Sequence, residues 1–100
     1  MKAYNMTIPS NDDLGQEIIW AKNTKEARKK ARLSNLYLEN AESFSDLSVS
    51  RSPEFDDCEN MNSIDFAWKQ HCEGWEWYEF PKLNNENLTK ADFIKIFNSL

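Results

Sequence analysis

Residues 2–8 alternate apolar and polar side chains, a period of two that is typical of a strand with one buried face. Turn-forming residues occupy 9–13, and Gly15 lies where a hairpin loop would pass into a second apolar stretch over 17–21. A loop of this length joins antiparallel neighbours. The pattern therefore predicts an antiparallel β-hairpin at the start of the chain.

A helix is expected next, because Asn23 and Glu26 have the spacing of a capping box. The helix would span residues 24–34. Ala27 and Ala31 share one face, and their small side chains would let the helix lie close to the sheet. Another face collects the basic residues Lys25, Arg28, Lys29 and Arg32.

The middle of the chain gives a weaker pattern. Over 35–45 the hydrophobic period is ambiguous, although Leu36, Leu38 and Phe44 supply apolar anchors, so a loop that can include a helical turn is expected. Residues 46–51 alternate at period two and predict a third strand, which Pro53 would end. An acidic connection follows over 54–61.

The last forty residues predict two helices around a strand. Asn62 or Ser63 would cap a short helix that ends before Gly74, and Thr89 would cap a terminal helix. Between them, the alternating residues 75–80 predict a fourth strand. The expected fold is α+β in the order β-β-α-β-α-β-α, with an antiparallel-leaning sheet of about four strands and two to three helices.

Composition limits the kind of protein that this fold can be. One hundred residues fit one domain, 1–100, and 13% aromatic residues with only two Gly and three Pro argue against a disordered chain. The first residues lack the apolar core of a signal peptide, and no window is apolar enough to span a membrane. We therefore expect a cytoplasmic protein, with Cys58 and Cys72 as reduced thiols.

The net charge of −5 is distributed unevenly. Residues 1–34 hold seven Lys and Arg against four Asp and Glu, whereas residues 35–89 hold three against twelve. The acidic belt between residues 39 and 79 consists of Glu39, Glu42, Asp46, Glu54, Asp56, Asp57, Glu59, Asp65, Glu73, Glu76 and Glu79. A surface of this kind attracts a basic groove and accelerates encounter with it, and most basic grooves in cells hold nucleic acid. Plain solubility is the alternative explanation of the belt.

Catalysis and metal binding find little support in the sequence. Cys58, His71 and Cys72 are the only soft metal ligands; they form no CxxC knuckle, and His71 and Cys72 would point about 100° apart on a helix. The acidic surroundings disfavour a reactive thiolate, and no GxSxG, HExxH or phosphate-binding loop is present. We predict a protein that is not an enzyme and holds no metal or cofactor.

Two stretches, 19–28 and 49–56, resemble small proteins of bacteriophages and other mobile elements. In that group a strand ends in alanine before a basic helix, and a later strand ends in a Val-x-Arg-x-Pro-Glu-aromatic-Asp sequence. The size, acidity and strand–helix–strand order are also similar to several anti-CRISPR proteins. That resemblance implies a cytoplasmic protein that blocks a nucleic-acid-handling complex, and it brings no catalytic residue with it.

The leading hypothesis is therefore a phage-derived inhibitor, most specifically an anti-CRISPR protein, that binds a host complex with a basic surface and binds no nucleic acid or membrane itself. The carboxylates expected to carry the contact are Asp56, Asp57, Glu59, Glu73, Glu76 and Glu79. One alternative is a nucleic-acid-binding accessory protein that uses the basic helix 24–34, and another is a phage assembly adaptor. The sequence leaves the oligomeric state open.

Overall fold

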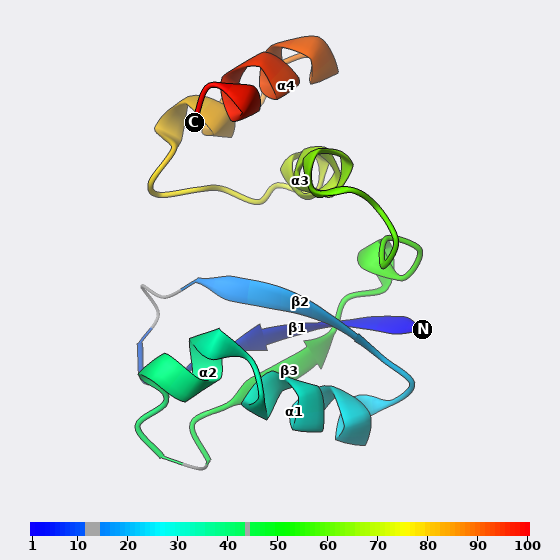
Figure 1. Ribbon diagram of the computed structural model, residues 1–100, viewed down its shortest axis with the longest axis vertical. Helices are drawn as coiled ribbons and strands as arrows, with labels where there is room; N and C mark the ends of the chain where they lie inside the picture. Colours follow the sequence, from blue (N-terminus) through cyan, green and yellow to red (C-terminus); the bar gives the residue numbers. More distant parts are fainter. Residues whose placement is uncertain (12–14, 44) are drawn as a thin grey trace. The chain divides into compact units, whose positions relative to one another are not determined.

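The computed structural model describes residues 1–11, 15–43 and 45–100 (Figure 1). Contacts between residues group the chain into two compact units, Met1–Glu59 and Asn60–Leu100. The first contains β1 (Lys2–Thr7), β2 (Gln16–Ala21), α1 (Thr24–Arg32), α2 (Asn35–Asn40), β3 (Ser48–Arg51) and the 3-10 turn η2 (Pro53–Phe55). The second contains α3 (Ser63–Cys72), the 3-10 turn η3 (Pro81–Asn84) and α4 (Lys90–Asn98). That residues 1–100 form one domain stays a prediction.

The sheet has three antiparallel strands among the described residues, in the order β2-β1-β3. The predicted hairpin of β1 and β2 is confirmed, with Tyr4 opposite Ile19. Gly15 enters β2 with a φ of +78°, in the left-handed region that glycine adopts without strain. Asp12 and Asp13 of the expected turn lie outside the described residues.

Helix α1 covers one face of this sheet, as its two alanines predict (Figure 1). Ala27 and Ala31 are completely buried, and the absence of longer side chains lets the helix backbone approach the strands closely. The core beneath it consists of Met6, Ile8, Ile19, Ala31 and Leu47 in one cluster and Tyr4, Ala21 and Ala27 in the other. At the start of the helix the Asn23 side chain accepts a hydrogen bond from the Glu26 N–H at 2.9 Å. The expected N-terminal cap is confirmed.

The ambiguous segment 35–45 contains a real helix, α2. Its first turn is capped by Ser34, whose hydroxyl accepts a hydrogen bond from the Tyr37 N–H at 3.3 Å. Leu36 and Tyr37 pack against the sheet core, while Leu38 is 64% exposed. Two apolar contacts within six residues are too few to show a period, which explains the ambiguity. Phe44, the other predicted anchor, lies outside the described residues.

The second unit is built on two capped helices. Asn62 caps α3 by accepting from the Asp65 N–H at 2.9 Å, and Thr89 caps α4 by accepting from the Asp92 N–H at 3.2 Å. Their shared core is formed by Ala67, Leu83 and Phe93, with Trp68, Trp77, Leu88, Ile96 and Phe97 packed around it. Phe93 is completely buried and lies at the centre of the aromatic contacts.

The predicted fourth strand is wrong, because residues 75–80 form no strand. The alternation of Trp75–Phe80 mimics a strand, but a strand needs a neighbour for its backbone hydrogen bonds. At Trp77 the backbone hydrogen bonds are made with the side chain of Asn84 instead of a neighbouring strand, and η3 begins at Pro81, directly after this segment. The α+β class is confirmed, with three strands in the described chain where about four were expected.

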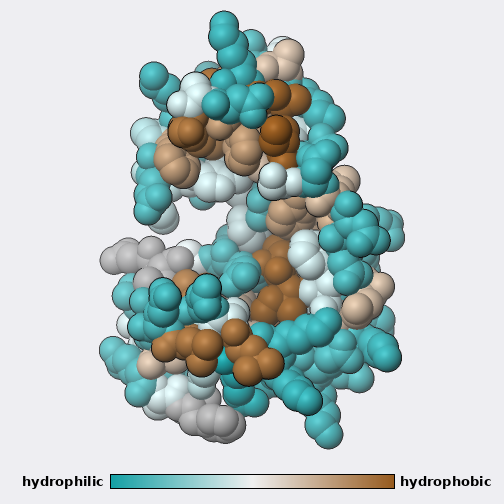
Figure 2. Space-filling view, in the orientation of Figure 1, coloured by the Kyte–Doolittle hydropathy of each residue, from teal (hydrophilic) through white to brown (hydrophobic). Residues whose placement is uncertain are grey.

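Hydrophobic side chains break an otherwise mostly hydrophilic face of the molecule (Figure 2). Among the described residues the exposed large hydrophobic side chains include Met1, Leu33, Leu38, Leu100 and, at 87%, Tyr78. None of the helices in the described ranges has the length and apolar character needed to cross a bilayer.

Candidate functional site

The six predicted contact carboxylates are divided between the two units. Asp56, Asp57 and Glu59 lie in the first, directly after the sheet, and Glu73, Glu76 and Glu79 lie in the second, after α3. The surroundings of each carboxylate decide whether its charge is available to a partner.

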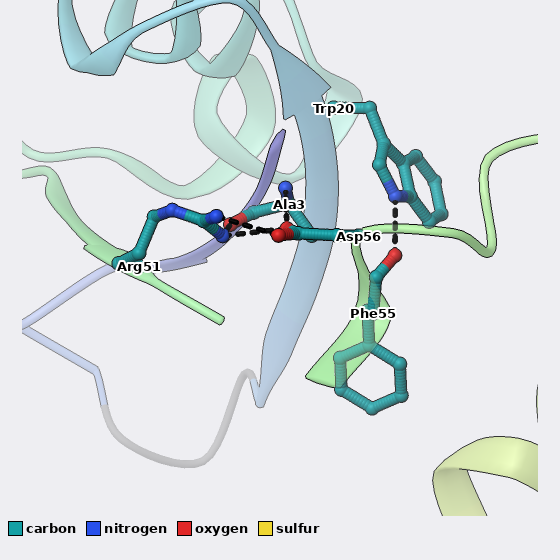
Figure 3. Close-up of polar contacts among 5 residues, drawn as sticks. All are labelled: Ala3, Trp20, Arg51, Phe55 and Asp56. Carbon is teal, nitrogen blue, oxygen red and sulfur yellow. Dashed lines mark hydrogen bonds and ion pairs between the residues drawn. The ribbon is translucent and has the colours of Figure 1, made fainter. Parts of the chain in front are cut away.

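Asp56 stabilises the fold of the first unit. Both of its oxygens accept hydrogen bonds from the Arg51 guanidinium at 2.6 Å, and Oδ1 also accepts from the Ala3 N–H at 2.7 Å (Figure 3). The Ala3 carbonyl in turn accepts from Arg51 at 2.9 Å and from the Ser52 N–H at 3.0 Å. We call this arrangement the Arg51–Asp56 clasp. It joins the end of β3 to the neighbouring strand β1.

The clasp also sets the protonation of Asp56. Its hydrogen bonds with Arg51, and then with the Ala3 N–H, lower the pKa of Asp56 from 3.8 to about 2. Beside it, the Trp20 indole N–H donates to the Phe55 carbonyl at 2.8 Å and ties η2 to β2 (Figure 3). A carboxylate with three such donors is a structural group rather than a free contact charge.

Asp46, another member of the acidic belt, is also structural. It is 8% exposed and accepts hydrogen bonds from the Ser10 hydroxyl, the Ser10 N–H at 3.0 Å and the Glu42 N–H at 3.1 Å. These bonds, that of the Ser10 hydroxyl first, lower its pKa. The belt is thus not a uniform surface, since part of its charge holds loops together.

Asp57 and Glu59 are different, because both are exposed and neither forms an ion pair in the described part of the chain. Between them Cys58 is 4% exposed, and its N–H donates to the Phe55 carbonyl at 3.1 Å. The buried cysteine fixes the backbone and leaves its two acidic neighbours at the surface. These two residues retain the availability that the sequence predicted.

In the second unit Glu73 is partly neutralised. It lies at the C-cap of α3 and pairs with Lys69, one turn earlier, at 2.8 Å. Glu76 and Glu79 are exposed and have no ion pair among the described residues. These two glutamates lie in the segment Trp75–Phe80, which we call the acidic loop.

The start of the acidic loop is set by the end of α3. Gly74 has a φ of +90°, its N–H donates to the His71 carbonyl, and the Trp75 N–H donates to the Gln70 carbonyl, both at 3.0 Å. This pair of bonds is a Schellman motif, which needs glycine at the left-handed position. The Gly74 prediction is confirmed, and the motif directs the chain sharply away from the helix axis.

The middle of the acidic loop is held by Asn84. Its Oδ1 accepts from the Trp77 N–H at 2.8 Å, and its Nδ2 donates to the Trp77 carbonyl at 3.0 Å. The Trp77 side chain packs on Phe93, with ring centroids 5.9 Å apart. Backbone and side chain of Trp77 are thus both fixed, and we call this pair the Asn84–Trp77 clamp.

Tyr78 and Asn84 were missed by reasoning from sequence. Tyr78 is 87% exposed between Glu76 and Glu79, an unusual position for an aromatic side chain. The predicted strand over 75–80 hid this exposure, because a side chain on a strand is expected to be partly covered by its neighbours in the sheet. Asn84 stood in a polar asparagine-rich stretch with nothing to distinguish it, since its role depends on a contact seven residues away.

An open depression of about 490 Å³ lies beside the acidic loop. Residues from the end of α3, from the loop and from the segment after η3 line it, among them His71, Trp75, Glu76, Asn84, Asn85 and Glu86. The His71 ring is itself fixed by stacking on Trp68, with centroids 5.3 Å apart.

Neither cysteine is part of a cluster that could hold a metal ion in the described residues. Both are free thiols, Cys58 buried and Cys72 exposed, and no three His, Cys, Asp or Glu side chains there converge as a metal site would require.

The basic helix of the alternative hypothesis is α1. Its four predicted cations are not equally accessible, since Lys25 and Lys29 are exposed while Arg28 and Arg32 are half-buried. Lys30, which the sequence analysis did not include, pairs with Glu26 at 3.3 Å and donates to the Trp20 carbonyl at 2.7 Å. The helix therefore does not present a continuous row of exposed cations.

No family model, curated protein or solved structure matches this chain.

Proposed function

We propose that this chain is a binding protein whose acidic loop occupies a cationic surface of a host complex that handles nucleic acid, and so blocks it. In its most specific form the proposal is an inhibitor of a CRISPR effector complex. The observation that carries it is Tyr78, 87% exposed between two unpaired glutamates on a loop whose backbone is clamped.

Three physical properties of the acidic loop support this function. Tyrosine is among the side chains that contribute most to interface affinity, because its large rigid area costs little entropy to immobilise. Glu76 and Glu79 supply charge that is not already neutralised by a neighbour in the described chain. The Asn84–Trp77 clamp fixes the loop before binding, which lowers the cost of ordering it in a complex.

Asp57 and Glu59 form a second, separate set of contact charges in this proposal. Exposed ion pairs contribute about 0.2–1 kcal/mol each, so they would increase the rate of encounter more than the affinity. Asp56 is not part of the contact set, because its charge is already used by the Arg51–Asp56 clasp. Glu73, paired with Lys69, has a secondary part at most.

The test uses purified CRISPR effector complexes of several types, each loaded with guide RNA and labelled target DNA. The expected result is displacement of DNA from at least one effector in a mobility-shift gel, and loss of displacement for the triple variant Glu76→Lys, Tyr78→Ala, Glu79→Lys. A matched control is Glu17→Lys, which changes an exposed glutamate on β2. If every effector is unaffected by the wild-type chain, the specific proposal is refuted; if the triple variant still displaces DNA, the loop is not the contact.

The same gels include lanes of chain and DNA alone at low salt. Retarded DNA in those lanes would favour the nucleic-acid-binding alternative through α1.

A further inference from the structure

The depression beside the acidic loop carries an inference about the chemistry of the partner. Its lining includes two carboxylates, Glu76 and Glu86, and contains no lysine or arginine. Neither carboxylate has an ion pair or a hydrogen bond elsewhere in the described residues. Two unpaired negative groups on one concave surface favour a cationic occupant.

The walls of the depression are held in place by hydrogen bonds. Asn84 is fixed by the Asn84–Trp77 clamp, and the Asn85 Oδ1 accepts from the Asn87 N–H at 2.9 Å. The Leu88 N–H donates to the Asn85 carbonyl at 3.2 Å, and the Schellman motif fixes the backbone of Trp75. The backbone that carries Glu76 and Glu86 is thus organised before a ligand arrives, so little conformational entropy remains to be lost.

The shape and lining suit one cation better than others. An arginine guanidinium is planar and has five N–H donors. It can hydrogen-bond to carboxylates on two sides and stack on an aromatic ring at the same time. The depression offers carboxylates on two segments, and the aromatic residue Trp75 also belongs to its lining. A volume of about 490 Å³ accommodates such a head group with part of its stem. A lysine ammonium is compact and strongly hydrated, and would use fewer of these groups.

We propose that this depression receives an arginine side chain of the partner. The inference rests on the proposed function, since the arginine belongs to the cationic surface that the acidic loop covers. It also predicts that the isolated protein binds a free arginine analogue weakly, and more tightly than the lysine analogue.

The experiment titrates the full chain with N-acetyl-L-arginine amide and follows the backbone and indole N–H signals by ¹H–¹⁵N NMR. Saturable shifts are expected at Gly74, Trp75, Asn85 and Glu86, with the lysine analogue binding more weakly. Glu86→Gln should weaken binding about threefold to fivefold, the upper range for one exposed ion pair. Glu79→Gln is the matched control, since Glu79 is exposed and unpaired but does not line the depression.

Three results would overturn the inference: no saturable shift up to ~50 mM analogue, equal binding of the lysine analogue, or equal weakening by Glu79→Gln. A well-dispersed spectrum of each variant shows that it is folded, so loss of binding is not mistaken for unfolding. Failure here is separable from failure of the proposed function. Effector inhibition without arginine binding removes only this inference, whereas arginine binding without inhibition leaves the site and removes the inhibitor role.

Discussion

The Asn84–Trp77 clamp makes a quantitative prediction for Asn84→Ala. The substitution removes both hydrogen bonds that the side chain makes to the Trp77 backbone, at 2.8 and 3.0 Å. The two Trp77 groups are not affected equally. The carbonyl keeps the Phe80 N–H as a donor at 3.3 Å, while the N–H keeps no other partner within the described residues.

The expected loss is about 2 kcal/mol. A net hydrogen bond contributes about 0.5–1.5 kcal/mol, and a donor left without a partner in a partly buried position adds about 1 kcal/mol or more. For a chain of this size that corresponds to a fall in Tm of roughly 8–16 °C if unfolding is two-state. Local opening of the loop would raise the hydrogen-exchange rate of the Trp77 amide about thirtyfold for the same free energy.

Urea unfolding followed by tryptophan fluorescence, together with amide exchange at Trp77, measures both effects. Asn87→Ala is the control, because this nearby asparagine is exposed and its side chain makes no hydrogen bond in the described structure; it should change stability by less than about 0.5 kcal/mol. If Asn84→Ala and Asn87→Ala have equal stability and equal Trp77 exchange, the clamp does not hold the acidic loop and its preorganisation is refuted.

Other substitutions test the remaining structural statements. Because the pKa of Asp56 is lowered from 3.8 to about 2, the ionised form is favoured by folding, so its contribution is complete above about pH 4 and is lost as pH falls toward 2. Asp56→Asn should flatten that part of the stability–pH curve measured by urea midpoints, and an unchanged slope would contradict the clasp. Gly74→Ala should destabilise by about 1–2 kcal/mol through its φ of +90°, with no steric clash to add, as thermal unfolding can show. Phe93→Ala should cost about 3–5 kcal/mol, because the ring is completely buried; a loss below 1 kcal/mol in denaturant unfolding would place the core of the second unit elsewhere.

The parts of the fold that depend on local pattern could be predicted from the sequence. The hairpin follows from alternation on both sides of a turn, and α1 follows from Asn23 as a cap and from the alanines that face the sheet. Gly74 was also predictable, because the end of a helix requires a residue that adopts positive φ. In each case the signal and the structure lie within a few residues of each other.

The errors share a different cause. The period of two in Trp75–Phe80 shows only that apolar and polar side chains alternate. A strand also requires a hydrogen-bonded neighbouring strand. At Trp77 the side chain of Asn84 makes the backbone hydrogen bonds instead. Asp56 is bound by Arg51, five positions earlier, and by the Ala3 N–H, fifty-three positions earlier. Its charge appeared free in the sequence because only the fold brings these donors together. Charge counts alone cannot separate structural carboxylates from available ones.

The measurement that tests the proposed contact most directly is a hydrogen-exchange footprint of the chain bound to an effector from which the displacement assay shows that it releases DNA. We predict that protection on binding is greatest at 76–80 and 84–87, with smaller changes at 57–59. Protection confined to α1, where Lys25 and Lys29 are exposed, would contradict the acidic loop as the contact surface and favour the basic helix instead.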